Sequence, residues 1–291
     1  MRRSWRAALV GVVLSWGCAL AAPTPRPQRI VSLSPNTTEM LYGIGAFERV
    51  VGVSVYCTYP PAVSKLPRVG GWQDSSIEKI VALHPDLVVL TDAQVPFIAE
   101  QMHAFGLKSA VVPTRSVADV FRAIKLLGEA TGNQREAAEL SRKTQAAIED
   151  VRARTRNLKT KTVLLTVSRA PGELRDLYVA TQGSYLIDLV EIAGGRSVTE
   201  PGRNGYSKIS KEAIVSLDPE LILDLVHEST GRFGGDPKQA WNDLPELRAV
   251  RQGHVYAIRE DYVGHASQFI AETARLLART IHPEAYAGEH R

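Results

Sequence analysis

The first third of the chain alternates between short apolar runs and longer segments with helical spacing. The apolar runs are rich in Val and Ile and are bounded by Pro, Gly or polar residues, which is typical of buried strands. The segments between them carry helix start and stop signals. Because the order is β-α-β-α-β-α-β, the pattern predicts a parallel sheet covered by helices. The four predicted strands are residues 29–34, 50–54, 87–90 and 108–113.

Residues 116–157 predict two consecutive helices. The first, residues 116–132, is amphipathic and begins with a capping box from Ser116 to Asp119. The second, residues 133–157, is highly charged and contains no Gly or Pro. As a helix it would span at most ~37 Å. Between two α/β lobes such a helix is a stiff strut, so we expect the lobes to close only slightly around a ligand.

The pattern after residue 160 repeats that of the first lobe. It predicts strands at 162–168 and 253–261, and helices at 183–195 and 267–285. The predicted fold is therefore α/β, with two similar lobes that each contain a mostly parallel sheet with helices, bridged by one long α-helix. The predicted boundaries are 29–132 for the N-terminal lobe, 133–160 for the bridging helix and 161–287 for the C-terminal lobe.

An internal repeat supports the two-lobe organisation. Residues 70–90 and residues 204–224 fall into register when 134 is added to each position of the first copy. Two copies are too few for a solenoid, and they suit two similar lobes. The matched pairs include Gly71 and Gly205, Trp72 and Tyr206, and Glu78 and Glu212.

The first 21 residues have the composition of a secretory signal peptide. Three Arg precede an apolar run that is too short for a membrane span, and small residues at 19–21 form a cleavage signal. We therefore expect the mature protein in the periplasm. Cys18 follows "LSWG", which loosely resembles a lipoprotein box, so lipid attachment at Cys18 is the second interpretation of this segment.

Loss of residues 1–21 changes the charge balance and the cysteine count. Three Arg and no acid are removed, which leaves 32 Lys and Arg against 31 Asp and Glu. This near-neutral balance gives no argument for a nucleic acid partner. Cys57 is then the remaining cysteine, so an intramolecular disulfide is excluded and the thiol is expected to pack as a small hydrophobe.

The chain lacks the common catalytic motifs. It contains no GxSxG, HExxH, P-loop or CxxC pattern, and its seven His show no close pairing and no His-rich acidic loop. We therefore predict no enzyme, no catalytic residue, no protein-bound metal and no cofactor. An enzyme with two nitrogenase-like lobes and a cofactor in the cleft is the alternative from another class, and it would need cluster-binding cysteines. An adhesion module would give no reason for the duplicated Glu.

Aromatic and polar residues at predicted loops are the candidate ligand contacts. In α/β lobes, loops at one end of the sheets line the crevice where ligands bind. Trp72 and Tyr206 occupy equivalent loops, so they are predicted to face each other across a cleft, although they could instead cover the edges of the two cores. The other candidates are Tyr56 after the second strand, Tyr178 before a helix, and Asp261 and His265 after the last strand.

Glu78 and Glu212 are candidates for protein docking. An acid in the first turn of a helix is favoured by the helix dipole by ~0.3–1 kcal/mol, which alone could explain both residues. However, the Lys beside each Glu is not at an equivalent position, because Lys79 follows Glu78 whereas Lys211 precedes Glu212. The two Glu themselves occupy equivalent positions of the repeat. Two equivalent acids suit a partner with two-fold symmetry and basic sockets.

Several stretches resemble the helical-backbone class (class III) of periplasmic substrate-binding proteins, which serve ABC importers for cobalamin, haem and ferric siderophores. The resemblance covers about residues 29–285 and is carried by "RIVSLSPNTTEMLYGIGAFERVVGVS", "GGWQDSSIEKIVALHPDLVVL" and "SKEAIVSLDPELIL". It implies a monomer that binds a small molecule and delivers it to a two-fold permease dimer. In this family the acids that match Glu78 and Glu212 meet arginines of the permease.

Within that class the chain is most similar to the cobalamin-binding proteins. Trp72–Gln73 matches their "WQ" loop, whereas related haem binders tend to have a Tyr there that ligates iron. The resemblance thus implies a corrinoid, cobalamin or cobinamide, as the transported ligand, with haem or a ferric siderophore as the alternative. His265 and Thr91 depart from the Arg and Trp of that subgroup, which leaves the exact corrinoid open. The residues at corrinoid-contacting positions are Tyr56, Trp72, Tyr178, Tyr206, Asp261 and His265.

Overall fold

Short buried runs of β-branched residues form the sheet of the N-terminal lobe. The computed structural model describes residues 26–226 and 236–288, so the predicted signal peptide and Cys18 lie outside the described residues. The four N-terminal strands are all parallel, as predicted, and their order in the sheet is β2-β1-β3-β4. They are β1 (Ile30–Ser32), β2 (Val50–Val53), β3 (Leu87–Thr91) and β4 (Ser109–Val112).

Helices connect these strands at the predicted places. Ser76 is the N-cap of α2, where its hydroxyl accepts a hydrogen bond from the backbone N–H of Lys79. Pro35 opens α1, because proline is tolerated in the first turn of a helix. The helices of this part are α1 (Pro35–Gly43), α2 (Ile77–Ala82) and α3 (Val95–Ala104), with short 3₁₀ helices η1 (Phe47–Arg49), η2 (Pro61–Lys65) and η3 (Asp92–Gln94).

The C-terminal lobe contains a mixed sheet of six strands. Strands β10, β9, β5 and β7 are parallel, whereas β6 and β8 continue the sheet in the antiparallel sense. The predicted parallel part is confirmed, but the sequence pattern missed β6, β7 and β8. The strands are β5 (Lys161–Ser168), β6 (Tyr178–Ala180), β7 (Gly195–Ser197), β8 (Tyr206–Lys208), β9 (Leu221–Leu225) and β10 (Val255–Ile258).

The helices of the C-terminal lobe repeat the local features of the first. Ser210 caps α7 as Ser76 caps α2, with its hydroxyl accepting from the backbone N–H of Ala213. The helices are α6 (Tyr185–Ile192), α7 (Lys211–Leu217), α8 (Pro237–Trp241), α9 (Arg248–Arg251) and α10 (Ile270–Ile281), and the 3₁₀ helices are η4 (Arg203–Gly205), η6 (Asp261–Gly264) and η7 (Pro283–Tyr286).

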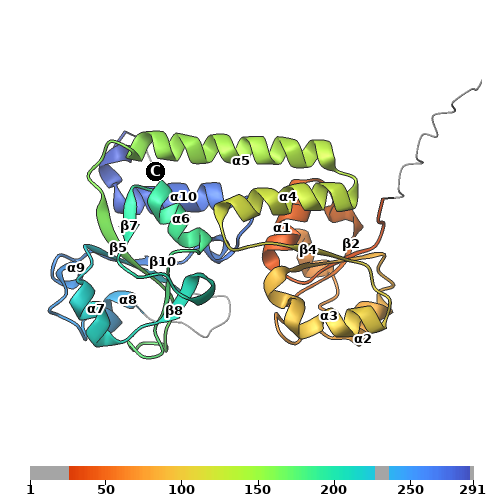
Figure 1. The fold of residues 1–291 in the computed structure, drawn as a ribbon, viewed down its shortest axis with the longest axis horizontal. Helices are drawn as coiled ribbons and strands as arrows, with labels where there is room; N and C mark the ends of the chain where they lie inside the picture. The colour runs from red at the N-terminus through yellow and green to blue at the C-terminus, as the bar shows by residue number, and fades with distance from the viewer. Residues whose placement is uncertain (1–25, 227–235, 289–291) are drawn as a thin grey trace, which may run out of the picture.

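Two long helices lie on the same side of the molecule, where α5 (Gln134–Thr155) runs along both lobes and α4 (Val117–Thr131) lies beneath it on the side of the N-terminal lobe (Figure 1). The predicted capping box of Ser116 and Asp119 starts α4, and the predicted strut is α5. Its 22 residues correspond to about 33 Å of helix. Helix α5 packs against α4 at one end and against α6 and α10 of the C-terminal lobe at the other. None of the helices in the described ranges is both long enough and apolar enough to span a bilayer.

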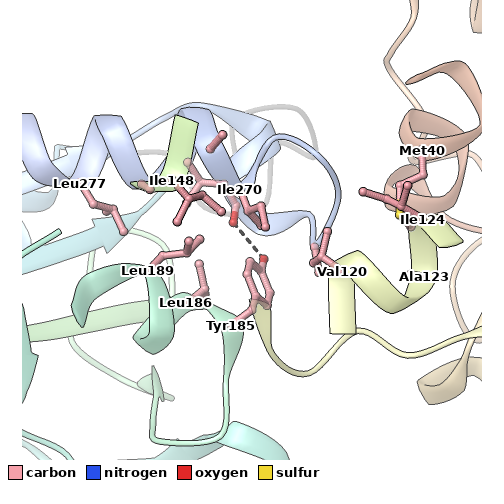
Figure 2. Close-up of a cluster of buried hydrophobic side chains, with 14 of the residues drawn as sticks. Met40, Val120, Ala123, Ile124, Ile148, Tyr185, Leu186, Leu189, Ile270 and Leu277 are labelled. Carbon is pink, nitrogen blue, oxygen red and sulfur yellow. Dashed lines mark hydrogen bonds between the residues drawn. The ribbon is translucent and has the colours of Figure 1, made fainter. Parts of the chain in front are cut away.

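The largest cluster of buried apolar residues extends through both lobes. Figure 2 shows Met40 of α1 and Ile124 of α4 at one end and Ile148 of α5 and Leu277 of α10 at the other. Tyr185 of α6 lies in the same cluster, and its hydroxyl donates a 2.9 Å hydrogen bond to the carbonyl oxygen of Val263. Since the cluster is continuous, moving one lobe relative to the other would expose apolar surface.

Cys57 lies just after β2 and is 1% exposed. Its Sγ is 3.2 Å from Oγ1 of Thr38, and burial raises the pKa of the thiol to about 11. The predicted packing of Cys57 as a small hydrophobe is confirmed.

Leu127 and Leu126 provide a matched test of the packing of α4. Leu127 is fully buried, whereas the neighbouring Leu126 is 41% exposed. We expect Leu127→Ala to lower the free energy of unfolding by about 2–5 kcal/mol, because it leaves a cavity in the shared core. Leu126→Ala should cost clearly less. Urea titrations followed by circular dichroism measure both, and equal losses would contradict this account.

Cys57 should resist alkylation in the native protein. At pH 8 its raised pKa leaves less thiolate than an exposed cysteine would have. Peptide mapping after iodoacetamide treatment should show slow labelling of Cys57 in buffer and fast labelling in urea. Fast native labelling would show that the site opens.

The same pKa shift makes the stability of the protein depend on pH. Because the pKa of the thiol in the folded protein exceeds its ordinary value of 9.0, the stability contributed by the neutral thiol is complete below about pH 9 and decreases as the pH rises towards 11.

Candidate ligand-binding cleft

A cleft of about 910 Å³ lies between the two lobes. Its N-terminal wall is built from the segments that follow β1, β2, β3 and β4, and its C-terminal wall includes the segment that follows β10. These are the carboxyl ends of parallel strands, where ligands of α/β proteins usually bind. The volume is near the upper end of the roughly 300–1,000 Å³ of small-molecule sites.

Five of the six predicted ligand contacts line this cleft. Tyr56 and Trp72 come from the N-terminal lobe, and the C-terminal lobe supplies Tyr206, Asp261 and His265. Tyr178 is not among the lining residues. It lies on the antiparallel strand β6, between β5 and β8, and its side chain is 44% exposed. The sequence pattern placed Tyr178 in a loop because it missed this strand, and a ligand contact by Tyr178 stays a prediction.

Trp72 is held by a buried glutamine. Gln94 is 1% exposed, and its Nε2 donates to the carbonyl oxygens of Leu33, at 2.9 Å, and of Trp72, at 3.3 Å. Gly70 precedes this loop with φ of +123°, and a Cβ there would lie 2.6 Å from the carbonyl oxygen of Asp74. The Trp72 ring packs on Phe97 with 5.6 Å between ring centroids. An aromatic wall therefore faces the cleft from the N-terminal lobe.

Tyr206 lines the cleft from the other lobe, where it is the first residue of β8 and not the loop residue that the sequence predicted. The preceding Gly205 has φ of +80°, and a Cβ there would lie 2.7 Å from the carbonyl oxygen of Gly183, so only glycine allows this approach. Burial raises the pKa of the Tyr206 phenol, and a hydrogen bond with Ser184 offsets part of this rise. Tyr206 therefore stays protonated at neutral pH and can donate a hydrogen bond.

The polar rim of the cleft contains residues that the sequence analysis did not select. Asp92 follows β3 and accepts a 3.1 Å hydrogen bond from Thr114 Oγ1. Arg115 lies 3.7 Å from the same carboxylate, and both side chains are accessible. Asp92 and Arg115 lie just after predicted strands, and this position was the sequence signal that could have identified them. Asn36, Gln73 and Asn204 also line the cleft.

A buried carboxylate joins the two lobes behind the cleft. Glu39 of α1 is 2% exposed, yet it contacts residues that follow η6 in the C-terminal lobe. Its Oε1 lies 2.7 Å from Nδ1 of His265, and its Oε2 accepts a 2.6 Å hydrogen bond from Ser267 Oγ. The carbonyl oxygen of Glu39 accepts from Nε2 of Gln268 at 2.9 Å. The sequence analysis did not select Glu39, because its partners lie more than 200 residues away.

The two candidate docking acids are fully exposed. Glu78 and Glu212 lie in the first turns of α2 and α7, at the edge of each lobe that is far from α5 (Figure 1). The pKa of each carboxylate is lowered. The main cause is a hydrogen bond from its own backbone N–H, and the smaller cause is a hydrogen bond from the capping hydroxyl of Ser76 or Ser210. Both acids are therefore ionised at neutral pH.

Within residues 26–226 and 236–288, no three His, Cys, Asp or Glu side chains cluster closely enough to hold a metal ion.

Comparison with known proteins places this fold in a family. A family model described as "Periplasmic binding protein" matches residues 30–262. The chain is 26% identical to the ABC transporter substrate-binding lipoprotein YvrC of Bacillus subtilis, over 89% of this chain and 82% of that protein. It is 25% identical to a vitamin B12-binding protein of Yersinia pestis, over 89% of this chain and 88% of that protein.

Solved structures share the fold. The periplasmic vitamin B12-binding protein of Vibrio cholerae superimposes with a TM-score of 0.76 at 23% identity, covering 89% of this chain and 98% of that one. The periplasmic heme-binding protein RhuT of Roseiflexus gives 0.76 at 24% identity, with 89% and 99% covered. The predicted fold class is thereby confirmed. The chain belongs to the periplasmic binding protein family, as a non-enzymatic substrate-binding component of an ABC importer.

Proposed function

We propose that the chain binds a corrinoid, cobalamin or cobinamide, in the cleft between its lobes and delivers it to its permease. The observation that carries this proposal is the pair of aromatic residues at equivalent positions of the internal repeat, Trp72 and Tyr206, which line one large cleft. The name of the Yersinia relative supports the ligand class. Haem is the second candidate, because a heme-binding protein shares the fold equally well.

The chemistry of the cleft suits a bulky ring with polar edges. A corrinoid has broad apolar faces and a rim of amide side chains. Trp72 and Phe97 offer an apolar surface to such a face. Arg115, Asp261 and Asn204 offer donors and acceptors for amides. Charges of both signs line the cleft, namely Asp92, Asp261 and Arg115. This mixture suits the proposed ligand, which needs hydrogen bonds more than ion pairs.

Glu78 and Glu212 are the proposed contacts with the permease. They are equivalent residues of the two lobes and lie at corresponding helix starts. Being ionised and exposed, they can form charge-assisted hydrogen bonds with arginines on a two-fold partner. Opposite charges on the two proteins would also accelerate association, so the complex should weaken as salt rises.

Export and anchoring are part of the same proposal. Residues 1–21 are proposed as the signal peptide, and lipid attachment at Cys18 is the alternative outcome of the same segment. The Bacillus relative is named as a lipoprotein. The mature chain, with lobes at 29–132 and 161–287 around the bridging helix at 133–160, is proposed to act as a monomer.

Trp72→Ala should weaken corrinoid binding by ~1–3 kcal/mol, the scale of losing the contacts of one large buried side chain. The expected change is measurable by calorimetry with cobalamin and cobinamide. Phe105→Ala is the matched control, because Phe105 is 57% exposed and does not line the cleft. Tight haemin binding without any corrinoid signal would replace the corrinoid by the second candidate.

The double variant Glu78→Gln/Glu212→Gln should bind the corrinoid normally and lose uptake through the cognate permease. The effect should exceed that of either single variant, because two contacts are deleted. The control is Glu136→Gln/Glu272→Gln, which removes two exposed acids from the first turns of α5 and α10 and so changes only helix-dipole stabilisation. Uptake assays beside affinity measurements decide the matter, and normal uptake in the first double variant would refute the docking role.

A further inference from the structure

The imidazole of His265 has one ring nitrogen fixed and one free. Nδ1 lies 2.7 Å from the buried carboxylate of Glu39. Carboxylate oxygens accept hydrogen bonds, so the tautomer that satisfies Glu39 carries its hydrogen on Nδ1. In the neutral ring, Nε2 therefore holds a lone pair. No hydrogen bond joins Nε2 to any residue of the described ranges.

The ring with the free nitrogen is part of the cleft wall. His265 lines the cavity together with Gly264 and Ala266. Its side chain is 19% exposed, whereas the Glu39 side chain is 3% exposed. One edge of the ring is thus anchored in the protein, and the opposite edge is left for whatever occupies the cleft.

We propose that Nε2 of His265 is an axial ligand of the metal at the centre of the bound tetrapyrrole, with Glu39 as its positioning residue. This inference rests on the proposed function, because it requires a ligand that brings its own metal. No bond is broken in the protein. The Nε2 lone pair replaces one exchangeable water on the cobalt of a corrinoid, and the water leaves to solvent.

The surroundings of His265 are those of a prepared ligand. Histidines that bind metals usually donate their other ring N–H to a carboxylate or a carbonyl, which fixes the tautomer and raises the basicity of the coordinating nitrogen. Glu39 has this position, and Ser267 Oγ holds the second carboxylate oxygen at 2.6 Å. Gln268 fixes the backbone of Glu39 from the same segment. A residue that only closed the junction between the lobes would not need to line the cavity, as His265 does.

The placement also suits a planar ring between the lobes. His265 belongs to the C-terminal lobe, while Trp72 and Phe97 form an aromatic wall on the N-terminal lobe. A macrocycle that rests on the aromatic wall would occupy the same cavity that His265 lines. The metal is the atom of such a ring that a free imidazole nitrogen can coordinate.

The test uses two probes, diaquacobinamide, whose cobalt carries two exchangeable waters, and haemin. Imidazole in place of water on either metal shifts the visible absorption bands. With diaquacobinamide we expect this shift in the wild-type protein and not in His265→Ala, together with an affinity loss of about 10- to 100-fold. His103→Ala is the control, because His103 is exposed on α3 and outside the cleft.

Two further variants separate ligation from a structural effect. In His265→Gly, free imidazole should restore the shifted bands, which loss of folding would not allow. Glu39→Gln keeps an acceptor for Nδ1 and should retain the band shift with a weaker affinity. Thermal unfolding of each variant verifies that it is folded.

The outcomes distinguish this inference from the proposed function. If diaquacobinamide binds wild type and His265→Ala with equal affinity and identical spectra, the ligation is refuted and corrinoid binding stands. If haemin alone gives shifted bands that depend on His265, the ligation stands and the corrinoid is refuted. If neither probe binds, both are refuted.

Discussion

The relative position of the two lobes depends on one buried carboxylate. Glu39 lies on the first helix and accepts hydrogen bonds from a segment near the end of the chain, at His265, Ser267 and Gln268. Removing a carboxylate from water is costly unless its oxygens are hydrogen-bonded, and here both oxygens and the residue's own carbonyl have partners. The continuous apolar cluster and α5 hold the lobes along the same side. The cleft is the space that this fixed junction leaves open.

The internal repeat has two roles in this geometry. At the start of each copy, a glycine is followed by an aromatic residue, Trp72 or Tyr206, that lines the wall of the cleft. A few residues later, a capped helix carries an acid, Glu78 or Glu212, on the outer surface. The same short unit thus contributes to the proposed ligand site and to the proposed contact with the permease. The lobes differ where β6 and β8 extend the second sheet in the antiparallel sense.

The sequence predicted the parts of the fold whose signals are local. The parallel strands, the capping box at Ser116 and the glycine-free α5 all have patterns long enough to read. Strands β6, β7 and β8 have three residues each, and unlike the equally short β1 they are not part of a longer alternating run. In the site, residues after predicted strands were accessible to reasoning, as Asp261 and His265 show. Glu39 was not, because a glutamate inside a predicted helix has no local sign of burial, and its partners are 226 residues or more away.

The stiffness of α5 has a consequence for the efficiency of transport, meaning the fraction of docking events that deliver a ligand. A continuous helix without glycine, packed at both ends, is expected to keep the outer acids at a nearly constant spacing whether the cleft is empty or filled. The empty protein would then compete with the loaded protein for the same docking sites. The permease would then distinguish the two forms only after docking, through contact with the contents of the cleft. The ratio of binding protein to permease would set how many docking events are unproductive.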